Sequence, residues 1–242
     1  MKSIIPNSLT ALNLFCGCFS VLAFLENDYY LGVVLIFISA TADFFDGFLA
    51  RLLNVQSELG KQLDSLADMI SFGFVPGVII YKALLEPIDC NESYLSEISN
   101  QNWIPMVGFI LTVFSGFRLA KFNIDKRQSN SFIGLPTPAC TLFFLTIPLI
   151  WINENPDEWA YKLTLNKPLI ISFTLFFSYL LIAELPLLAL KFKGFSLNEN
   201  KFRYALLFTG VTTVIILKYL AIPIILSLYI LLSLLENIIN SK

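Results

Sequence analysis

Four aspartates lie close together in the sequence, in or beside stretches that are otherwise apolar. They are Asp43, Asp46, Asp64 and Asp68, and all of them fall within residues 43–68. An ionisable side chain at membrane depth costs about 2.5 kcal/mol or more on insertion scales, so it is a candidate functional residue. Four of them in so short a stretch indicate a shared role.

The spacing of these aspartates places them on two helix faces, because residues three and four apart in a helix share a face. The first stripe joins two aspartates to small residues, Asp43, Asp46, Gly47 and Ala50, and Arg51 lies just beside it. The second stripe has the same character: Gly60, Asp64, Ala67 and Asp68. A short connection makes the two helices antiparallel neighbours. We therefore expect the carboxylates to converge between them, where small residues let backbones or a ligand approach closely.

The ligand types in this cluster favour a hard metal ion. The chain has no His, and its four Cys show no paired metal-binding spacing. Compact sets of carboxylates suit divalent cations such as Mg²⁺ or Mn²⁺. We interpret the four aspartates as a site for one or two such ions. The lack of His also leaves a carboxylate as the expected general base.

The same residues carry a resemblance to a known family. The pattern Asp43-x2-Asp46-Gly47-x2-Ala50-Arg51-x8-Gly60-x3-Asp64-x3-Asp68 resembles the signature of the CDP-alcohol phosphatidyltransferases. The resemblance implies an integral membrane enzyme with a six-helix catalytic core, which transfers a phosphatidyl group from a CDP-linked lipid to an alcohol and releases CMP. It implies that the aspartates hold metal and that Asp68 is also the general base. It assigns CDP-lipid binding to one set of residues: Thr10, Asn13, Asp46, Gly47, Ala50, Arg51 and Gly60.

For Thr10 and Asn13, which lie three apart on the first apolar stretch, a simpler role as polar contacts between helices remains open.

A later part of the chain resembles the branch of this family that uses serine. The resemblance is carried by SFGFVPG at 71–77, RLAKFN at 118–123 and the F-x-GLP-x-P turn at 132–138. It implies CDP-diacylglycerol and L-serine as substrates, with Arg118 and Lys121 binding the serine carboxylate. The serine hydroxyl would attack the β-phosphorus directly. Both basic residues could instead be side chains of a positively charged membrane boundary.

The composition indicates how these residues are positioned. The 242 residues are 56% hydrophobic and 14% charged, whereas soluble domains contain about 25% charged residues. With a mean hydropathy of +0.72, the chain is predicted to be an all-α, polytopic transmembrane helical bundle. Eight spans are expected: 8–25, 29–51, 62–85, 103–122, 137–153, 168–189, 204–219 and 221–239.

We expect these spans to form a single membrane domain over 1–242, with a catalytic core at about 1–190 and two extra spans at 204–239. The first apolar stretch is interpreted as a span rather than a cleaved signal peptide. Pro223 could mark either a hairpin or a kink between the last two spans.

The basic residues predict the orientation. With the N-terminus inside, twelve of the sixteen Lys and Arg lie on the inner side, while the outer loops at 86–102 and 154–158 are rich in acid. Both termini and the aspartates are then cytoplasmic, in the inner membrane. Trp103, Trp151 and Trp159 fall near outer span ends, as an aromatic belt would.

Membrane lipid is an expected partner, the family resemblance implies a homodimer, and no nucleic-acid partner is expected.

Three other functions compete with this interpretation. The acceptor could be another alcohol, such as glycerol phosphate or inositol phosphate. An ion or metal transporter would explain the carboxylates, but not Gly47, Ala50 and Arg51 at fixed spacing. Such a site is also expected near mid-membrane and often in repeated halves. A structural scaffold has no use for four buried aspartates.

Overall fold

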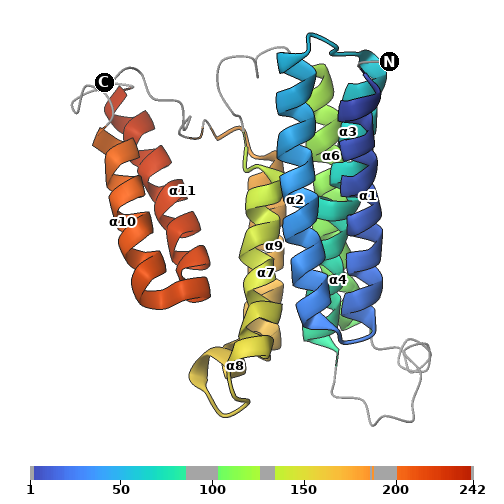
Figure 1. Cartoon of the computed structure of the whole chain (residues 1–242). Helices are drawn as coiled ribbons and strands as arrows, with labels where there is room; N and C mark the ends of the chain where they lie inside the picture. The colour runs from blue at the N-terminus through green and yellow to red at the C-terminus, as the bar shows by residue number, and fades with distance from the viewer. Residues whose placement is uncertain (1–2, 86–102, 126–133, 186, 188–200, 241–242) are drawn as a thin grey trace.

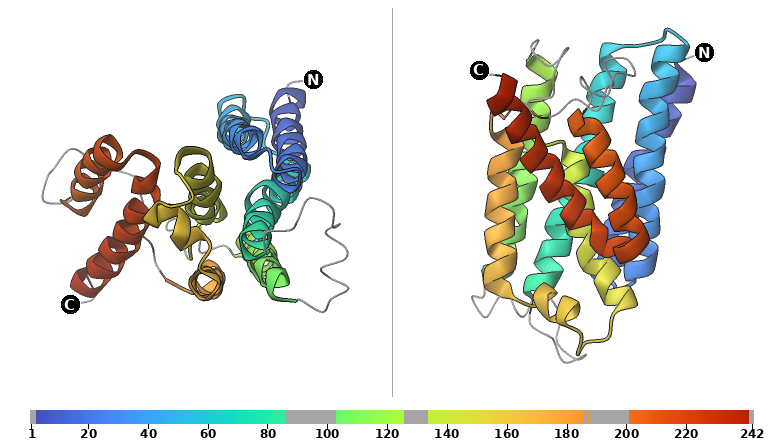
Figure 2. Two further views of the ribbon diagram at one scale, coloured as in Figure 1. Left: turned by 90° about the horizontal axis from the view of Figure 1, so that it is seen from below. Right: turned by 90° about the vertical axis from the view of Figure 1, so that its left-hand side faces the viewer.

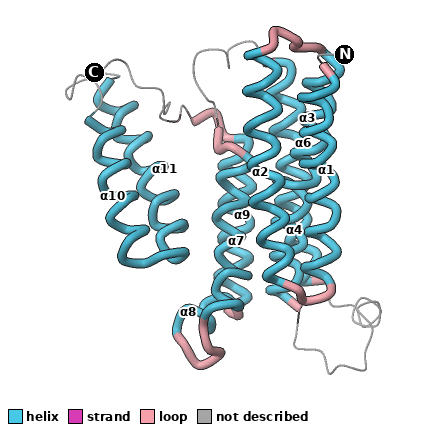
Figure 3. The backbone as a smooth tube through the Cα atoms, in the orientation of Figure 1, coloured by secondary structure: helices cyan, strands magenta, loops and turns pink. Residues whose placement is uncertain are grey.

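The computed structural model describes residues 3–85, 103–125, 134–185, 187 and 201–240. All regular structure in these residues is helical (Figure 3), which confirms the expected all-α fold. Several features that entered the sequence argument lie outside the described residues: the acidic loop 86–102, Lys126, Arg127, Phe132, Ile133, Lys191 and Lys193.

The helices follow one another along the chain. They are α1 (Ile4–Leu25), α2 (Tyr29–Leu52), α3 (Glu58–Asp68), the π-helix η1 (Met69–Phe74), α4 (Val75–Leu84), the 3-10 helix η2 (Ile104–Val107), α6 (Gly108–Ile124), α7 (Thr137–Asn153), α8 (Trp159–Thr164), α9 (Lys167–Ile182), α10 (Lys201–Leu217), the 3-10 helix η4 (Lys218–Leu220) and α11 (Ala221–Asn240).

Five helical segments of the described chain are long and apolar enough to cross a membrane: Ile4–Leu25, Tyr29–Leu52, Glu58–Leu84, Ile104–Ile124 and Lys201–Glu236. Two shorter apolar helices, α7 and α9, lie between them in the sequence. The last segment folds back on itself as α10 and α11 (Figure 1), so the described chain contains the eight apolar segments that were expected.

The bundle has three parts (Figures 1 and 2). Helices α1, α2, α3, α4 and α6 form one group, α7 and α9 stand beside it, and the hairpin of α10 and α11 lies on the far side of α7. Both termini are at the same end of the bundle, as an even number of spans requires. The short helix α8, which the sequence analysis did not predict, is at the other end.

A π-helical turn, η1, follows directly on the aspartates. Because Pro76 has no N–H, it cannot donate to the carbonyl of Phe72 four residues earlier. Thr141 Oγ1 on α7 donates to that carbonyl at 2.8 Å instead, and Thr112 Oγ1 on α6 donates to the carbonyl of Gly73 at 3.0 Å. Hydroxyls of neighbouring helices thus satisfy the freed backbone groups, as membrane-buried backbone requires.

The Gly-Leu-Pro turn before α7 locks the start of that helix in place. Gly134 has a φ of +80°, and a Cβ there would lie 2.9 Å from the carbonyl oxygen of Leu181. Only glycine combines that conformation with so close an approach. The Leu135 N–H donates to the carbonyl of Leu180 at 3.0 Å, which ties the turn to the end of α9.

The ends of two predicted spans have local explanations. Helix α9 ends at Ile182, earlier than the predicted 189, since Pro186 follows and disfavours helix in the residues before it. The last two spans are separated by a hairpin turn and not by a kink: Lys218 has a φ of 50° in η4, while Pro223 lies in the first turn of α11.

Candidate active site

Three of the four aspartates come together at one point. Asp43 from α2 and Asp64 and Asp68 from α3 each offer a carboxylate oxygen, and these oxygens all lie within 4.8 Å of one another. The three side chains are partly buried. Like charges so close together need compensation, and three convergent carboxylates suit a divalent cation.

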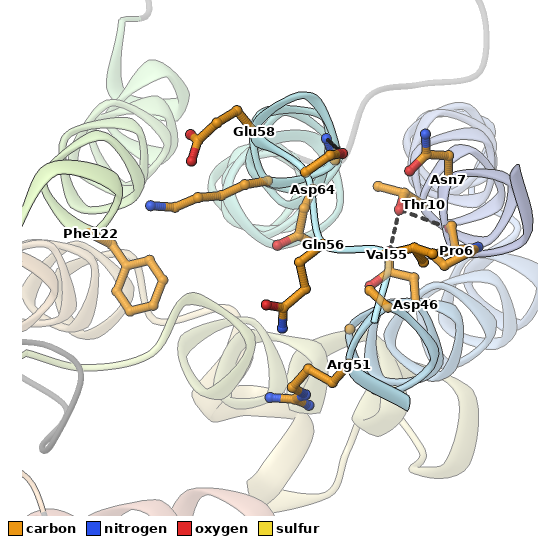
Figure 4. A pocket seen from close by; sticks show the side chains of 15 residues that line it. Pro6, Asn7, Thr10, Asp46, Arg51, Val55, Gln56, Glu58, Asp64 and Phe122 are labelled. Atoms are coloured by element: carbon orange, nitrogen blue, oxygen red, sulfur yellow. Dashed lines mark hydrogen bonds between the residues drawn. The ribbon is translucent and has the colours of Figure 1, made fainter. Parts of the chain in front are cut away.

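Asp46 points elsewhere. It is 5% exposed, and Thr10 Oγ1 of α1 donates a hydrogen bond to its Oδ2 at 2.5 Å (Figure 4). It is outside the group of carboxylates that could share an ion. The sequence spacing predicted its helix face, but the contact with α1 that turns this carboxylate away could not be predicted from spacing alone.

Asn13 holds Asp68 in position. Its Nδ2 donates to Asp68 Oδ1 at 3.3 Å, while its Oδ1 accepts hydrogen bonds from Ser39 at 2.5 Å and Ser71 at 2.7 Å. These contacts fix which way the buried amide faces. The two serines were missed by the sequence analysis, although Ser39 lies four residues before Asp43 and Ser71 three after Asp68, on the same helix faces.

A cavity of about 630 Å³ separates α2 from α3. Its lining comes from α1, α2, α3, the connection between them and α6: Pro6, Asn7, Thr10, Asp46, Gly47, Ala50, Arg51, Val55, Gln56, Ser57, Glu58, Gly60, Lys61, Asp64 and Phe122. Figure 4 looks into it, with Asp46 and Asp64 on different walls. Helix α1 packs along both α2 and α3, and the two helices still bring Asp43, Asp64 and Asp68 together, as expected.

Gly47 keeps this cavity open and is not needed for helix packing. A Cβ at this position would meet nothing nearer than Arg51 Nη2 at 3.9 Å. Gly60, by contrast, is close to other atoms, since a Cβ there would lie 3.1 Å from the N-capping Ser57 Oγ and 3.5 Å from Asn7 Oδ1. The first glycine therefore leaves room for a ligand, and the second lets α3 begin against α1.

A second cavity, of about 370 Å³, lies on the other side of the carboxylates. It is lined by α3, α6, the start of α7 and α11: Lys61, Asp64, Ser65, Asp68, Arg118, Leu119, Phe122, Asn123, Pro136, Thr137, Pro138 and Tyr229. The two cavities share Lys61, Asp64 and Phe122. They therefore meet beside the aspartate group.

The second cavity contains two buried polar atoms that have no hydrogen-bond partner among the described residues. One is Nε of Arg118, a side chain only 8% exposed whose Nη1 lies 3.5 Å from Thr137 Oγ1. The other is Oδ1 of Asn123, whose Nδ2 donates to Ser65 Oγ at 2.8 Å. Since buried polar groups are nearly always paired, this cation and this acceptor are suited to a bound ligand.

Lys121 has a different partner from the one its predicted role requires. Its Nζ lies 3.0 Å from Glu184 Oε1 beyond the end of α9, and it lines neither cavity. Asn123, two residues later, does line the smaller cavity. Asn123 belongs to the RLAKFN segment, but its unpaired oxygen can be recognised only in the structure.

These features define a polytopic helical membrane protein whose carboxylate group lies between two ligand-sized cavities. Residues 3–189 match the family model described as CDP-alcohol phosphatidyltransferase. The chain belongs to this family, which confirms the resemblance found in the sequence.

Curated relatives belong to the same group. A Bacillus subtilis protein named CDP-diacylglycerol–serine O-phosphatidyltransferase is 32% identical over 138 residues, covering 55% of this chain and 69% of the relative. A Helicobacter pylori protein of the same name is 30% identical over 183 residues, 74% of this chain and 70% of the relative. The archaetidylserine synthase of Methanothermobacter thermautotrophicus is 28% identical over 149 residues, 59% of this chain and 58% of the relative.

Proposed function

We propose that this protein transfers the phosphatidyl group of CDP-diacylglycerol to the hydroxyl of L-serine, giving phosphatidylserine and CMP. One observation carries the proposal: two cavities with different polar linings meet at Asp64, beside the other carboxylates of the cluster. A transferase needs a donor and an acceptor on the two sides of the reacting phosphorus.

The larger cavity fits the nucleotide part of the donor. Its volume of about 630 Å³ lies within the range usual for small-molecule sites, about 300–1,000 Å³. Arg51, at the end of α2, offers a guanidinium that suits a phosphate. The space beside Gly47 would then hold the cytidine and ribose, next to the hydrogen-bonded pair of Asp46 and Thr10.

The smaller cavity fits an amino acid with a hydroxyl. Arg118 provides positive charge for a carboxylate, and the unpaired Oδ1 of Asn123 is an acceptor for an ammonium group. A phosphorylated alcohol has no ammonium to offer. The smaller cavity thus offers a cation for a carboxylate and a hydrogen-bond acceptor for an ammonium group. Together with the names of the relatives, this favours L-serine over glycerol phosphate or inositol phosphate.

The reaction is a direct displacement. The serine Oγ forms a bond to the β-phosphorus, the bond from that phosphorus to the oxygen of CMP breaks, and CMP leaves with the electron pair. Asp68, held by Asn13, accepts the hydroxyl proton as general base.

The aspartates of the cluster are suited to Mg²⁺ or Mn²⁺. Asp43, Asp64 and Asp68 would hold the ion through their convergent oxygens. Such an ion, when bound, neutralises the diphosphate and stabilises the charge on the leaving group. Asp46, hydrogen-bonded to Thr10, would contact the donor from the neighbouring wall.

The orientation of the enzyme follows from its basic residues, which by the positive-inside rule put both termini and the aspartates on the cytoplasmic side of the inner membrane. Water-soluble serine and CMP would then exchange with the cytoplasm. The homodimer remains a proposal supported by the family resemblance.

The decisive experiment measures CMP release from CDP-diacylglycerol in detergent micelles, with and without L-serine and with and without EDTA. Release should require both serine and the metal, and glycerol 3-phosphate or inositol 1-phosphate should not replace serine. Release that is indifferent to serine would refute this acceptor. Divalent-metal uptake into proteoliposomes that survives Asp68→Asn would favour a transporter instead.

A further inference from the structure

The C-terminal hairpin contributes a side chain to the smaller cavity. Tyr229 of α11 lines this cavity together with Arg118, Asn123 and Asp68. Helix α11 lies beyond residue 189, where the match to the family model ends. The contribution of this hairpin therefore cannot be inferred from the family pattern.

One face of α11 is turned toward the bundle. Leu226, Tyr229, Ile230 and Ser233 follow one another at helical spacing, and Leu226 and Ser233 are buried. Leu226 belongs to the main apolar core, against which Tyr229 and Ile230 pack. Ser233 Oγ donates to the carbonyl of Tyr229 at 2.6 Å. The position of Tyr229 is therefore set by packing on both sides along its helix.

Polar contacts hold the hairpin at its two ends. At the turn, the Tyr219 hydroxyl donates to Glu154 Oε1, just after α7. At the open end, Arg203 of α10 lies 3.3 Å from Glu236 of α11, and the arginine side chain is 6% exposed. A buried ion pair between the two helices keeps them in register, so α11 keeps the same face against the bundle.

We propose that Tyr229 is an acceptor-binding residue, which completes the serine cavity from outside the six-helix core. A phenol hydroxyl can donate to a carboxylate or accept from an ammonium group, and an acceptor amino acid carries both. The ring also closes one wall of the cavity and so limits the size of the acceptor. This inference rests on the proposed function, since it names a residue of the same acceptor site.

The test compares Tyr229→Phe with a matched control. Tyr179→Phe, on α9, removes the hydroxyl of a tyrosine that is 63% exposed and lines neither cavity. In the full-length protein, Tyr229→Phe should raise the KM for L-serine about fivefold, as expected for one lost hydrogen bond. The KM for CDP-diacylglycerol should stay unchanged, and the control should match wild type throughout.

A second variant tests the role of the ring. Tyr229→Ala should enlarge the cavity and lower the preference for L-serine over L-homoserine, which is one methylene longer. An unchanged serine KM in Tyr229→Phe, together with an unchanged preference in Tyr229→Ala, would overturn the inference. A fall in Tm and kcat without a change in either quantity would also overturn it, because it would leave Tyr229 a purely structural role.

If the proposed function is wrong, the wild-type protein itself gives a different result. If wild-type protein releases CMP with another alcohol of the panel and not with L-serine, the choice of acceptor is wrong. The KM of Tyr229→Phe for that alcohol then decides the role of Tyr229 separately, again with Tyr179→Phe as the control.

Discussion

Asp68 is the aspartate whose surroundings suit proton transfer best. It lines the smaller cavity, and Asn13 donates to one of its oxygens at 3.3 Å. Asn13 is itself fixed by two serine hydroxyls. A general base must be held within reach of the proton that it removes, and this chain of contacts provides such a support from α1, α2 and η1.

Asp68→Asn should therefore abolish turnover while largely sparing nucleotide binding. General-base catalysis contributes about 10²–10⁴-fold, so kcat should fall by at least about 100-fold. CMP release gives kcat, and titration with CDP gives nucleotide affinity. Collapse of CDP binding along with kcat would assign Asp68 a purely ligating role.

Arg118 is the cation expected to recognise the acceptor. Hydrogen bonds to charged groups contribute about 1.5–3 kcal/mol, so Arg118→Ala should raise the KM for L-serine roughly 10- to 150-fold. The KM for CDP-diacylglycerol should change far less, since this side chain does not line the larger cavity. Equal effects on both substrates would argue for a structural role. Lys121→Ala provides a comparison for the KM of L-serine, because the ammonium group of Lys121 pairs with Glu184.

At the scale of residues, the sequence predicted the aspartates that could share a metal ion better than it predicted the polar lining of the smaller cavity. Helical spacing alone placed Asp64 and Asp68 on one face, and a short connection brought Asp43 to them. Spacing could not separate Arg118 from Lys121, since both are basic and lie on the same helix. What distinguishes them is the hydrogen bond from Lys121 to Glu184, which lies 63 residues further along the sequence.

At the scale of helices, two glycines in this bundle have opposite reasons to be small. Gly47 faces the larger cavity, whereas a Cβ at Gly77 would lie 2.3 Å from Thr112 Oγ1. That threonine is held by its hydrogen bond to the carbonyl of Gly73. The same substitution should therefore act on ligand binding at one position and on helix packing at the other.

Gly47→Ala should leave the Tm unchanged or higher, because alanine favours helix over glycine by about 1 kcal/mol, and should raise the KM for CDP-diacylglycerol. Gly77→Ala should lower stability by about 1–3 kcal/mol, as overpacking does. Thermal unfolding and the two KM values distinguish these outcomes. A lowered Tm in Gly47→Ala with an unchanged donor KM would contradict the assignment of this glycine to the cavity.

Hydropathy predicted the apolar segments well, but not how the backbone adapts within them. The π-helical turn before Pro76 depends on hydroxyls that α6 and α7 provide. A short connection sets the direction of the next helix, whereas the packing of α1 along both α2 and α3 depends on tertiary contacts that residue spacing does not encode.

At the scale of the whole molecule, the extra hairpin lines the smaller cavity, which its sequence did not indicate. Packing of α11 against the main apolar core brings Tyr229 to the smaller cavity. The spacing of Leu226, Tyr229, Ile230 and Ser233 was a signal available in the sequence. In a span that is apolar all round, however, such a stripe does not stand out.

The carboxylate cluster should make the stability of the whole protein depend on metal. Three carboxylates within 4.8 Å of one another repel in the metal-free protein. A ligand that binds only the folded state at 100 times its Kd stabilises it by about 2.7 kcal/mol. At roughly 2–4 °C per kcal/mol for a chain of this size, Mg²⁺ or Mn²⁺ should raise the Tm by roughly 5–10 °C over EDTA.

Two variants locate the ion. Asp43→Asn should raise the Tm in EDTA, by relieving repulsion, and should remove most of the metal-dependent shift. Asp46→Asn should keep most of the shift, because this carboxylate is hydrogen-bonded to Thr10 and lies outside the group of three. Thermal unfolding of both variants, with and without metal, provides the measurement. If Asp46→Asn removes the shift as fully as Asp43→Asn, all four aspartates hold metal, as the spacing in the sequence first suggested.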